Sequence, residues 1–169
     1  MAKVLFIQAK DIKEFTASNG NVDVDKLLPH LYKSQTIEVQ RLLGTKLYDK
    51  LISDITAGTL TGNYQTLVET YIKPILIHYA MMYALPYLSV TISNGGVYRN
   101  NPENATALTS DEINLLVEKE RDSAQYFAQR MIDFLNFNAS AMFSEYYTNS
   151  NEDISPDYDD NFGGWVISG

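Results

Sequence analysis

Apolar side chains recur every three or four residues along most of this chain, which is the period of an amphipathic α-helix. The first clear stripe predicts a helix from about Pro29 to Leu43, closed by Gly44 in a left-handed cap. The stripe consists of Leu28, Leu31, Tyr32, Gln35, Val39, Leu42 and Leu43. Gln35 is its polar interruption.

A second helix is expected from Lys46 to about Ala57, with Thr45 as its N-cap and Gly58 at its end. Because only a Gly-Thr turn separates it from the preceding helix, the two should meet at a tight corner.

The most apolar part of the chain follows, since residues 74–98 contain no Asp, Glu, Lys or Arg. A membrane span needs about 20 apolar residues, but polar residues and a turn at 93–96 interrupt this stretch. We therefore expect a buried central helix over about 67–88, kinked or divided at Pro74 and Pro86. A tyrosine stripe on it suits either the rim of the core or a surface that another subunit covers; it comprises Tyr71, Tyr79, Tyr83 and Tyr87.

Two further secondary-structure elements are predicted before the helical periodicity of apolar residues ends near Thr148. Residues 90–99 have the composition of a short β-hairpin around an Asn-Gly turn. Thr109 and Glu112 form a capping-box pattern that opens the longest helix, which keeps its period to about Leu135. From Thr148 onward no period survives, and Pro156 forbids a continuous helix.

The N-terminal residues differ from the helical body. Residues 3–8 alternate weakly and predict a strand that adds to a sheet edge, in this protein or in a neighbour, and one helical turn follows over 11–15. The run is too short for a signal peptide, so synthesis in the cytoplasm is expected.

The pattern as a whole predicts an all-α fold, a bundle of about four main helices with a small β-hairpin and extended N- and C-terminal arms. We divide the chain into an N-terminal arm or strand (1–22), a helical domain (23–147) and an acidic C-terminal docking arm (148–169).

The net charge of −8 is concentrated at one end of the chain. Residues 131–169 hold seven acidic side chains and no Lys or Arg. The acidic stretch ends in an apolar patch that a purely solvating tail does not need. We therefore predict protein-interaction residues at both extremities; they are Phe162, Trp165, Val166 and Ile167, together with Val4 and Phe6. The low pI of about 4.6 argues against broad nucleic-acid binding.

The chain has few candidate catalytic or metal-binding residues. It has no Cys, so disulfides, thiolate catalysis and zinc-thiolate sites are excluded. Its two histidines, His30 and His78, lie on different predicted helices without a metal-ligand spacing. Acidic pairs such as Asp111-Glu112 suit the first turn of a helix better than an acid-base site. We expect no enzyme, no cofactor and no metal.

Two segments carry a resemblance to a known family. They are Asp23-Val24-Asp25-Lys26-Leu27-Leu28-Pro29-His30 through Gln35, and Leu42-Leu43-Gly44-Thr45-Lys46-Leu47-Tyr48-Asp49-Lys50-Leu51. They resemble the head-to-tail connector proteins of tailed bacteriophages, closest to those of crAss-like and related phages of gut bacteria. The resemblance covers residues 3 to about 135.

That resemblance implies a small helical adaptor in the neck of the virion. Such a protein forms a homo-oligomeric ring, usually of twelve copies, beneath the portal protein and against tail or further neck proteins. DNA passes through the lumen without sequence-specific binding, and an acidic ring would repel the duplex rather than trap it. No membrane and no catalysis are implied. The alternatives are a tail-completion or other neck protein, a small helical regulatory or host-interacting protein and, remotely, a metal enzyme using His30 and His78.

Overall fold

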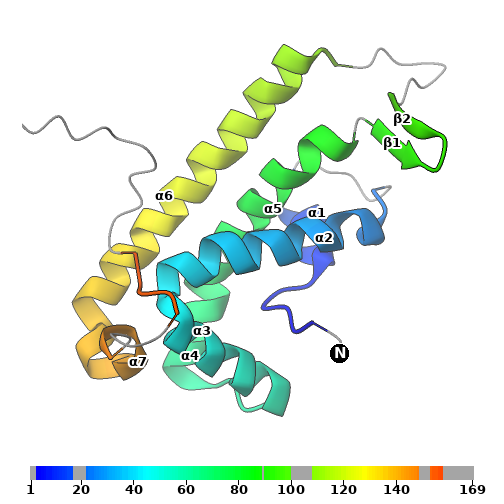
Figure 1. Cartoon of the computed structure of the whole chain (residues 1–169). Helices are drawn as coiled ribbons and strands as arrows, with labels where there is room; N and C mark the ends of the chain where they lie inside the picture. Colours follow the sequence, from blue (N-terminus) through cyan, green and yellow to red (C-terminus); the bar gives the residue numbers. More distant parts are fainter. Residues whose placement is uncertain (1–2, 17–21, 89, 100–107, 149–152, 158–169) are drawn as a thin grey trace, which may run out of the picture.

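A computed structural model describes residues 3–16, 22–88, 90–99, 108–148 and 153–157 of the 169-residue chain. It shows an all-α bundle with one two-stranded hairpin, as predicted (Figure 1). Among the described residues, four helices have eleven or more residues; they are α2 (Val24–Ser34), α3 (Gln40–Ala57), α5 (Lys73–Leu88) and α6 (Ser110–Met142).

The first long helical run begins earlier than expected. Helix α2 starts at Val24 rather than at Pro29, because the Asp23 carboxylate accepts a hydrogen bond from the Asp25 amide and caps the first turn. Pro29 therefore lies inside the helix. A π-helical segment, Gln35–Val39, joins α2 to α3, so the predicted single helix contains one wider turn.

Gly44 divides α3 into two helical parts, as the sequence predicted. Its backbone angles are φ 72° and ψ 157°. The positive φ was expected, but this ψ lies outside the left-handed helical region. The combination falls in a region of the Ramachandran plot that essentially only glycine occupies. Gly58, by contrast, is an ordinary left-handed cap at φ 68° and ψ 25°, with its amide bonded to the Ile55 carbonyl.

Helix α5 is the buried centre of the bundle. A short helix α4 (Gly62–Thr66) and a second π-helical segment, Leu67–Ile72, lead into it. Pro74 is the second residue of α5 and follows this change of helix type, whereas Pro86 lies in the last turn. None of the described helices is both long and apolar enough to cross a membrane.

The predicted tyrosine stripe of this region is split between core and surface. Tyr79 is buried, Tyr71 stacks on Phe134 with ring centroids 4.1 Å apart, and Tyr87 is half exposed. The core and rim interpretation therefore describes most of the stripe.

Helix α6 begins with the predicted capping box. The Thr109 hydroxyl accepts a bond from the Glu112 amide, and the Glu112 carboxylate accepts one from the Thr109 amide at 2.8 Å. The helix continues past the weakened pattern to Met142, and Phe143 then turns the chain into α7 (Ser144–Tyr147). Phe143 and Tyr146 are fully buried and close that end of the core.

The hairpin is confirmed as two antiparallel strands, β1 (Val90–Ser93) and β2 (Gly96–Arg99). It stands away from the helical body, beyond the C-terminal end of α5 (Figure 1). Val97 and Tyr98 on β2 are both more than half exposed.

The conformation of Gly44 gives a stability prediction. Gly44→Ala should lower the free energy of unfolding by about 1 to 3 kcal/mol, because a Cβ is strained at these backbone angles. Gly58→Ala is the matched control. It should lower the free energy of unfolding by only about 1 kcal/mol, since alanine is less strained in the left-handed helical region. Urea denaturation of both variants measures the difference, and a smaller loss at Gly44 than at Gly58 would contradict it.

Candidate functional site

Two polar side chains are buried in the π-helical segment Gln35–Val39, and they organise the candidate site. Gln35 is fully buried and Glu38 is 4% exposed. Buried polar groups destabilise a protein unless they are hydrogen-bonded, so their partners show what the segment holds in place. Directly or through Arg41, those partners include both ends of the described chain.

Gln35 binds the N-terminal residues through its side-chain amide. Its Oε1 accepts a 2.8 Å bond from the Phe6 backbone N–H, and its Nε2 donates a 3.0 Å bond to the Val4 carbonyl. The same Nε2 donates to the Tyr48 hydroxyl at 3.0 Å. One glutamine therefore provides an acceptor and a donor to the extended backbone of residues 4–6, as a neighbouring strand would.

The strand predicted over residues 3–8 is not formed within this chain. The segment pairs with a glutamine side chain of its own chain and is not part of the sheet, whose strands are β1 and β2. Phe6 is 8% exposed and packs on Tyr48 with ring centroids 5.3 Å apart. The Phe6 side chain, predicted as a docking residue, is thus covered by its own chain, while Val4 is half-buried.

The predicted N-terminal arm also contains a core helix. Helix α1 (Ala9–Phe15) buries Ile12 completely, and Lys73 of α5 pairs with Asp11 at 2.7 Å. The first part of the predicted 1–22 arm is therefore packed onto the bundle.

Glu38 connects the π-helical segment to α5 and α3. Its carboxylate accepts a short hydrogen bond from the Tyr83 hydroxyl and lies 3.5 Å from the Arg41 guanidinium. Burial, reinforced by the bond to Glu38, raises the pKa of the Tyr83 phenol far above its usual value. The Tyr83 side chain therefore stays a neutral phenol at physiological pH and donates its hydrogen bond to Glu38.

Arg41 in turn binds the C-terminal end of the described chain. We call residues 153–157 the C-terminal clasp. The Asp157 carboxylate pairs with the Arg41 guanidinium at 2.6 Å, and the Asp157 amide donates to the Arg41 carbonyl at 3.0 Å. Ile154 accepts a 2.9 Å bond from the Thr45 amide and donates a 3.1 Å bond to the Thr45 hydroxyl. Pro156, between them, is buried.

The clasp takes the place of a helical hydrogen bond. In an unbroken helix the Thr45 amide would donate to the Arg41 carbonyl, four residues earlier. Gly44 interrupts the helix between them, and the clasp supplies the Thr45 amide with an acceptor and the Arg41 carbonyl with a donor. The break thus becomes a docking site for an extended segment.

A polar cleft of about 600 Å³ borders this network between the π-helical segment, α5 and α6. Glu38 and Tyr83 line it from one side, and Arg121, Asp122 and Gln125 from α6. These carboxylates, amides and guanidinium groups suit hydrogen bonding and ion pairing.

The two histidines belong to separate environments. His78 pairs through Nδ1 with Glu120 at 2.7 Å and stacks on Phe127, whereas His30 packs against Tyr87. Burial, followed by the charge of Lys33, lowers the pKa of His30. Within the ranges that the structure describes, no group of three or more His, Asp or Glu side chains could hold a metal ion.

The predicted interaction residues of the C-terminal arm are Phe162, Trp165, Val166 and Ile167, and all four lie outside the described residues. The described part of the arm is the clasp. Gln35 was visible in the sequence as a polar residue in an apolar stripe, whereas the pairing of Arg41 with Asp157, 116 residues away, had no local signal.

Taken together, the fold and the site define an all-α protein in which residues 4–6 are hydrogen-bonded to the π-helical segment and residues 154–157 to the adjacent Gly44 corner. Residues 39–155 match a family of unknown function, DUF6712. The match spans well over half of the chain, so the chain belongs to this family. It includes both Thr45 and Ile154, while Gln35 and the N-terminal residues precede it. No curated protein and no solved structure matches the chain.

The role of Gln35 can be tested by a near-isosteric change. Gln35→Leu should lower the free energy of unfolding by about 1 to 3 kcal/mol, because it leaves the Phe6 amide and the Val4 carbonyl without their partner. Urea denaturation measures the loss, and amide hydrogen exchange at Phe6 should become faster. Gln129→Leu, at an exposed position on α6, is the control and should change stability by less than about 0.5 kcal/mol. Equal effects of the two variants would contradict the assignment.

Proposed function

We propose that this protein is a structural head-to-tail connector of a tailed bacteriophage. It forms a ring, with about twelve copies expected, between the portal protein and the tail or further neck proteins in the virion. DNA passes through the ring without sequence-specific contacts. Its C-terminal residues Phe162, Trp165, Val166 and Ile167 anchor it to a neighbouring protein.

The observation that carries the proposal is a helical surface that the described residues cover only in part. No side chain in residues 110–123 of α6 is buried, although the apolar stripe of the helix continues there through Ile113, Leu116 and Val117. Burial begins at Ala124. Figure 1 shows this part of α6 extending beyond the helical body.

An apolar stripe on a soluble helix is normally buried against another element. A neighbouring subunit would cover this one. The exposed Val97 and Tyr98 of the hairpin offer a further contact surface, since tyrosine is enriched at protein interfaces. A ring protein needs such surfaces, because each copy must bind the next.

Two further features support the proposal. The two segments that carry the resemblance to connector proteins lie within residues 23–51, which include α2, the π-helical segment and the Gly44 corner. The net charge of −8 suits a ring through which DNA moves without being retained.

Mass spectrometry of purified particles of the phage that encodes this chain tests the proposal. A connector should be present as a virion component at roughly a dozen copies, in a stoichiometry comparable to that of the portal protein. Electron microscopy of the same particles should place it in the neck; a position further along the tail would favour a tail-completion protein. Absence from particles and presence free in infected cells would contradict a connector and favour a regulatory protein.

A further inference from the structure

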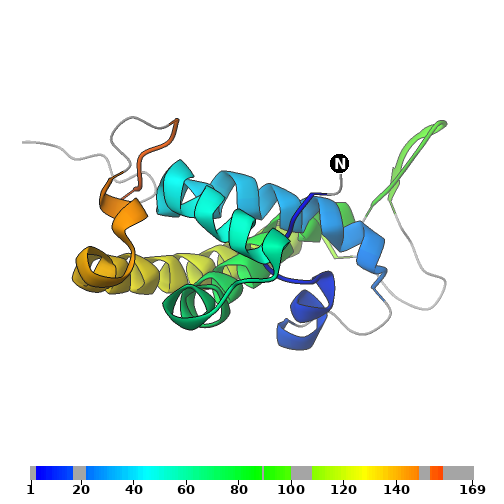
Figure 2. The same ribbon diagram turned by 90° about the horizontal axis from the view of Figure 1, so that it is seen from below.

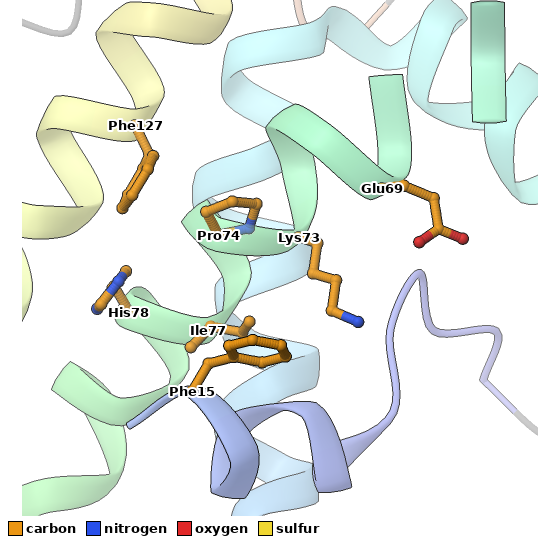
Figure 3. Close-up of a pocket in the computed structure, with 7 residues that line it drawn as sticks. All are labelled: Phe15, Glu69, Lys73, Pro74, Ile77, His78 and Phe127. Atoms are coloured by element: carbon orange, nitrogen blue, oxygen red, sulfur yellow. The ribbon is translucent and has the colours of Figure 1, made fainter. Parts of the chain in front are cut away.

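An apolar cleft of about 300 Å³ lies between α1, α5 and α6, away from the corner that holds the clasp. Figure 3 shows its walls: Phe15 from α1, Pro74, Ile77 and His78 from α5, and Phe127 from α6. Phe15 is 61% exposed, so one aromatic wall of the cleft is open to solvent. The cleft therefore offers apolar surface to a binding partner.

Ion pairs and ring contacts hold the walls of this cleft in position. His78 is fixed by its bond to Glu120 and lies almost parallel to Phe127, with ring centroids 5.5 Å apart. Lys73 is paired with Asp11 and lies 5.5 Å from the centre of the Phe15 ring. A preformed aromatic site of this kind suits an apolar anchor, because little ordering is needed on binding.

This chain carries such an anchor in its last twelve residues, 158–169. They contain Phe162 and, in Trp165, the only tryptophan of the protein, followed by Val166 and Ile167. Tryptophan is enriched among residues that dominate binding energy, and one aromatic side chain buries about 150 to 250 Å². An indole is thus of a suitable size and chemistry for the cleft.

The clasp determines where this tail leaves the body. Asp157 is bound to Arg41, and the next eight residues to Trp165 span at most about 29 Å when fully extended. In Figures 1 and 2 the clasp lies on the side of α2 and α3, whereas α1 lies on the opposite side of the bundle. A tail reaching the cleft of its own chain would therefore have to cross from one side of the bundle to the other, whereas binding to the cleft of an adjacent copy imposes no such path.

From this arrangement we infer that the C-terminal tail of one copy binds, through Trp165, in the apolar cleft between α1, α5 and α6 of a second copy. The contact joins two different surfaces, so its repetition closes a ring or extends a chain of subunits. The inference rests on the proposed function only in taking a second copy as the neighbour.

Fluorescence of Trp165 tests the contact in the full-length chain. Trp165→Ser removes the only indole, so a synthetic peptide of residues 158–169 then provides all tryptophan emission. Titrating this variant into the peptide should shift the emission to shorter wavelength and saturate. Adding Phe15→Asp should weaken binding at least tenfold, because it places a charge in the wall of the cleft.

Phe137→Asp is the matched control, since Phe137 is 87% exposed on α6 and does not line the cleft. It should change the affinity less than twofold, and circular dichroism should show that both variants keep their helix content. No saturable shift, or equal weakening by both substitutions, would overturn the inference.

The wild-type chain distinguishes a second copy from the same copy. Its emission should move to shorter wavelength as the protein concentration rises, and Phe15→Asp should abolish that change. A short-wavelength emission that does not depend on concentration would overturn the role of a second copy. These measurements use purified protein, so absence of the chain from phage particles would contradict the connector function without altering their outcome.

Discussion

The break in α3 at Gly44 is the constraint on which the rest of the structure depends. It separates the Thr45 amide from the Arg41 carbonyl, two groups that a continuous helix would join, and Ile154 and Asp157 bind them instead. A backbone amide or carbonyl in a protein interior needs a partner, so the corner and the clasp stabilise each other. The fold of the central helices is therefore completed by a segment more than 100 residues away in sequence.

The π-helical segment next to this corner gives the protein a second anchoring point. Gln35 holds residues 4–6, and Glu38 links Tyr83 to Arg41, which binds the clasp. Residues 4–6 and residues 154–157 thus bind to neighbouring turns of the helical segment from Gln35 to Thr45. The tail beyond Asp157 starts from a fixed position, which a docking segment requires if it is to reach one site on a neighbour. The buried polar network thereby connects the fold to the proposed assembly role.

Local pattern was sufficient to predict most of the helices. The glycine cap at Gly58, the capping box at Thr109 and the hairpin over 90–99 each depend on residues close in sequence, and each is present. Within this chain no strand forms over residues 3–8, because the hydrogen-bond partner of that segment is a side chain 29 residues away, which no alternation of apolar residues can indicate. The start of α2 was placed too late because the Asp23 cap outweighs the interior Pro29. The candidate site was the least predictable part, since the clasp pairs residues from opposite ends of the chain. Within the site, Gln35 gave a signal as a polar residue on an apolar face, and Gly44 gave one as the break between two helices.

Hydrogen-bond scalar couplings measured by NMR on the full-length chain test this account most directly. The account predicts one coupling between the Thr45 amide nitrogen and the Ile154 carbonyl carbon, and another between the Asp157 amide nitrogen and the Arg41 carbonyl carbon. A coupling from the Thr45 amide to the Arg41 carbonyl would show a continuous helix through residue 44. That result would contradict the account, because the corner would then need no segment from the C-terminal end.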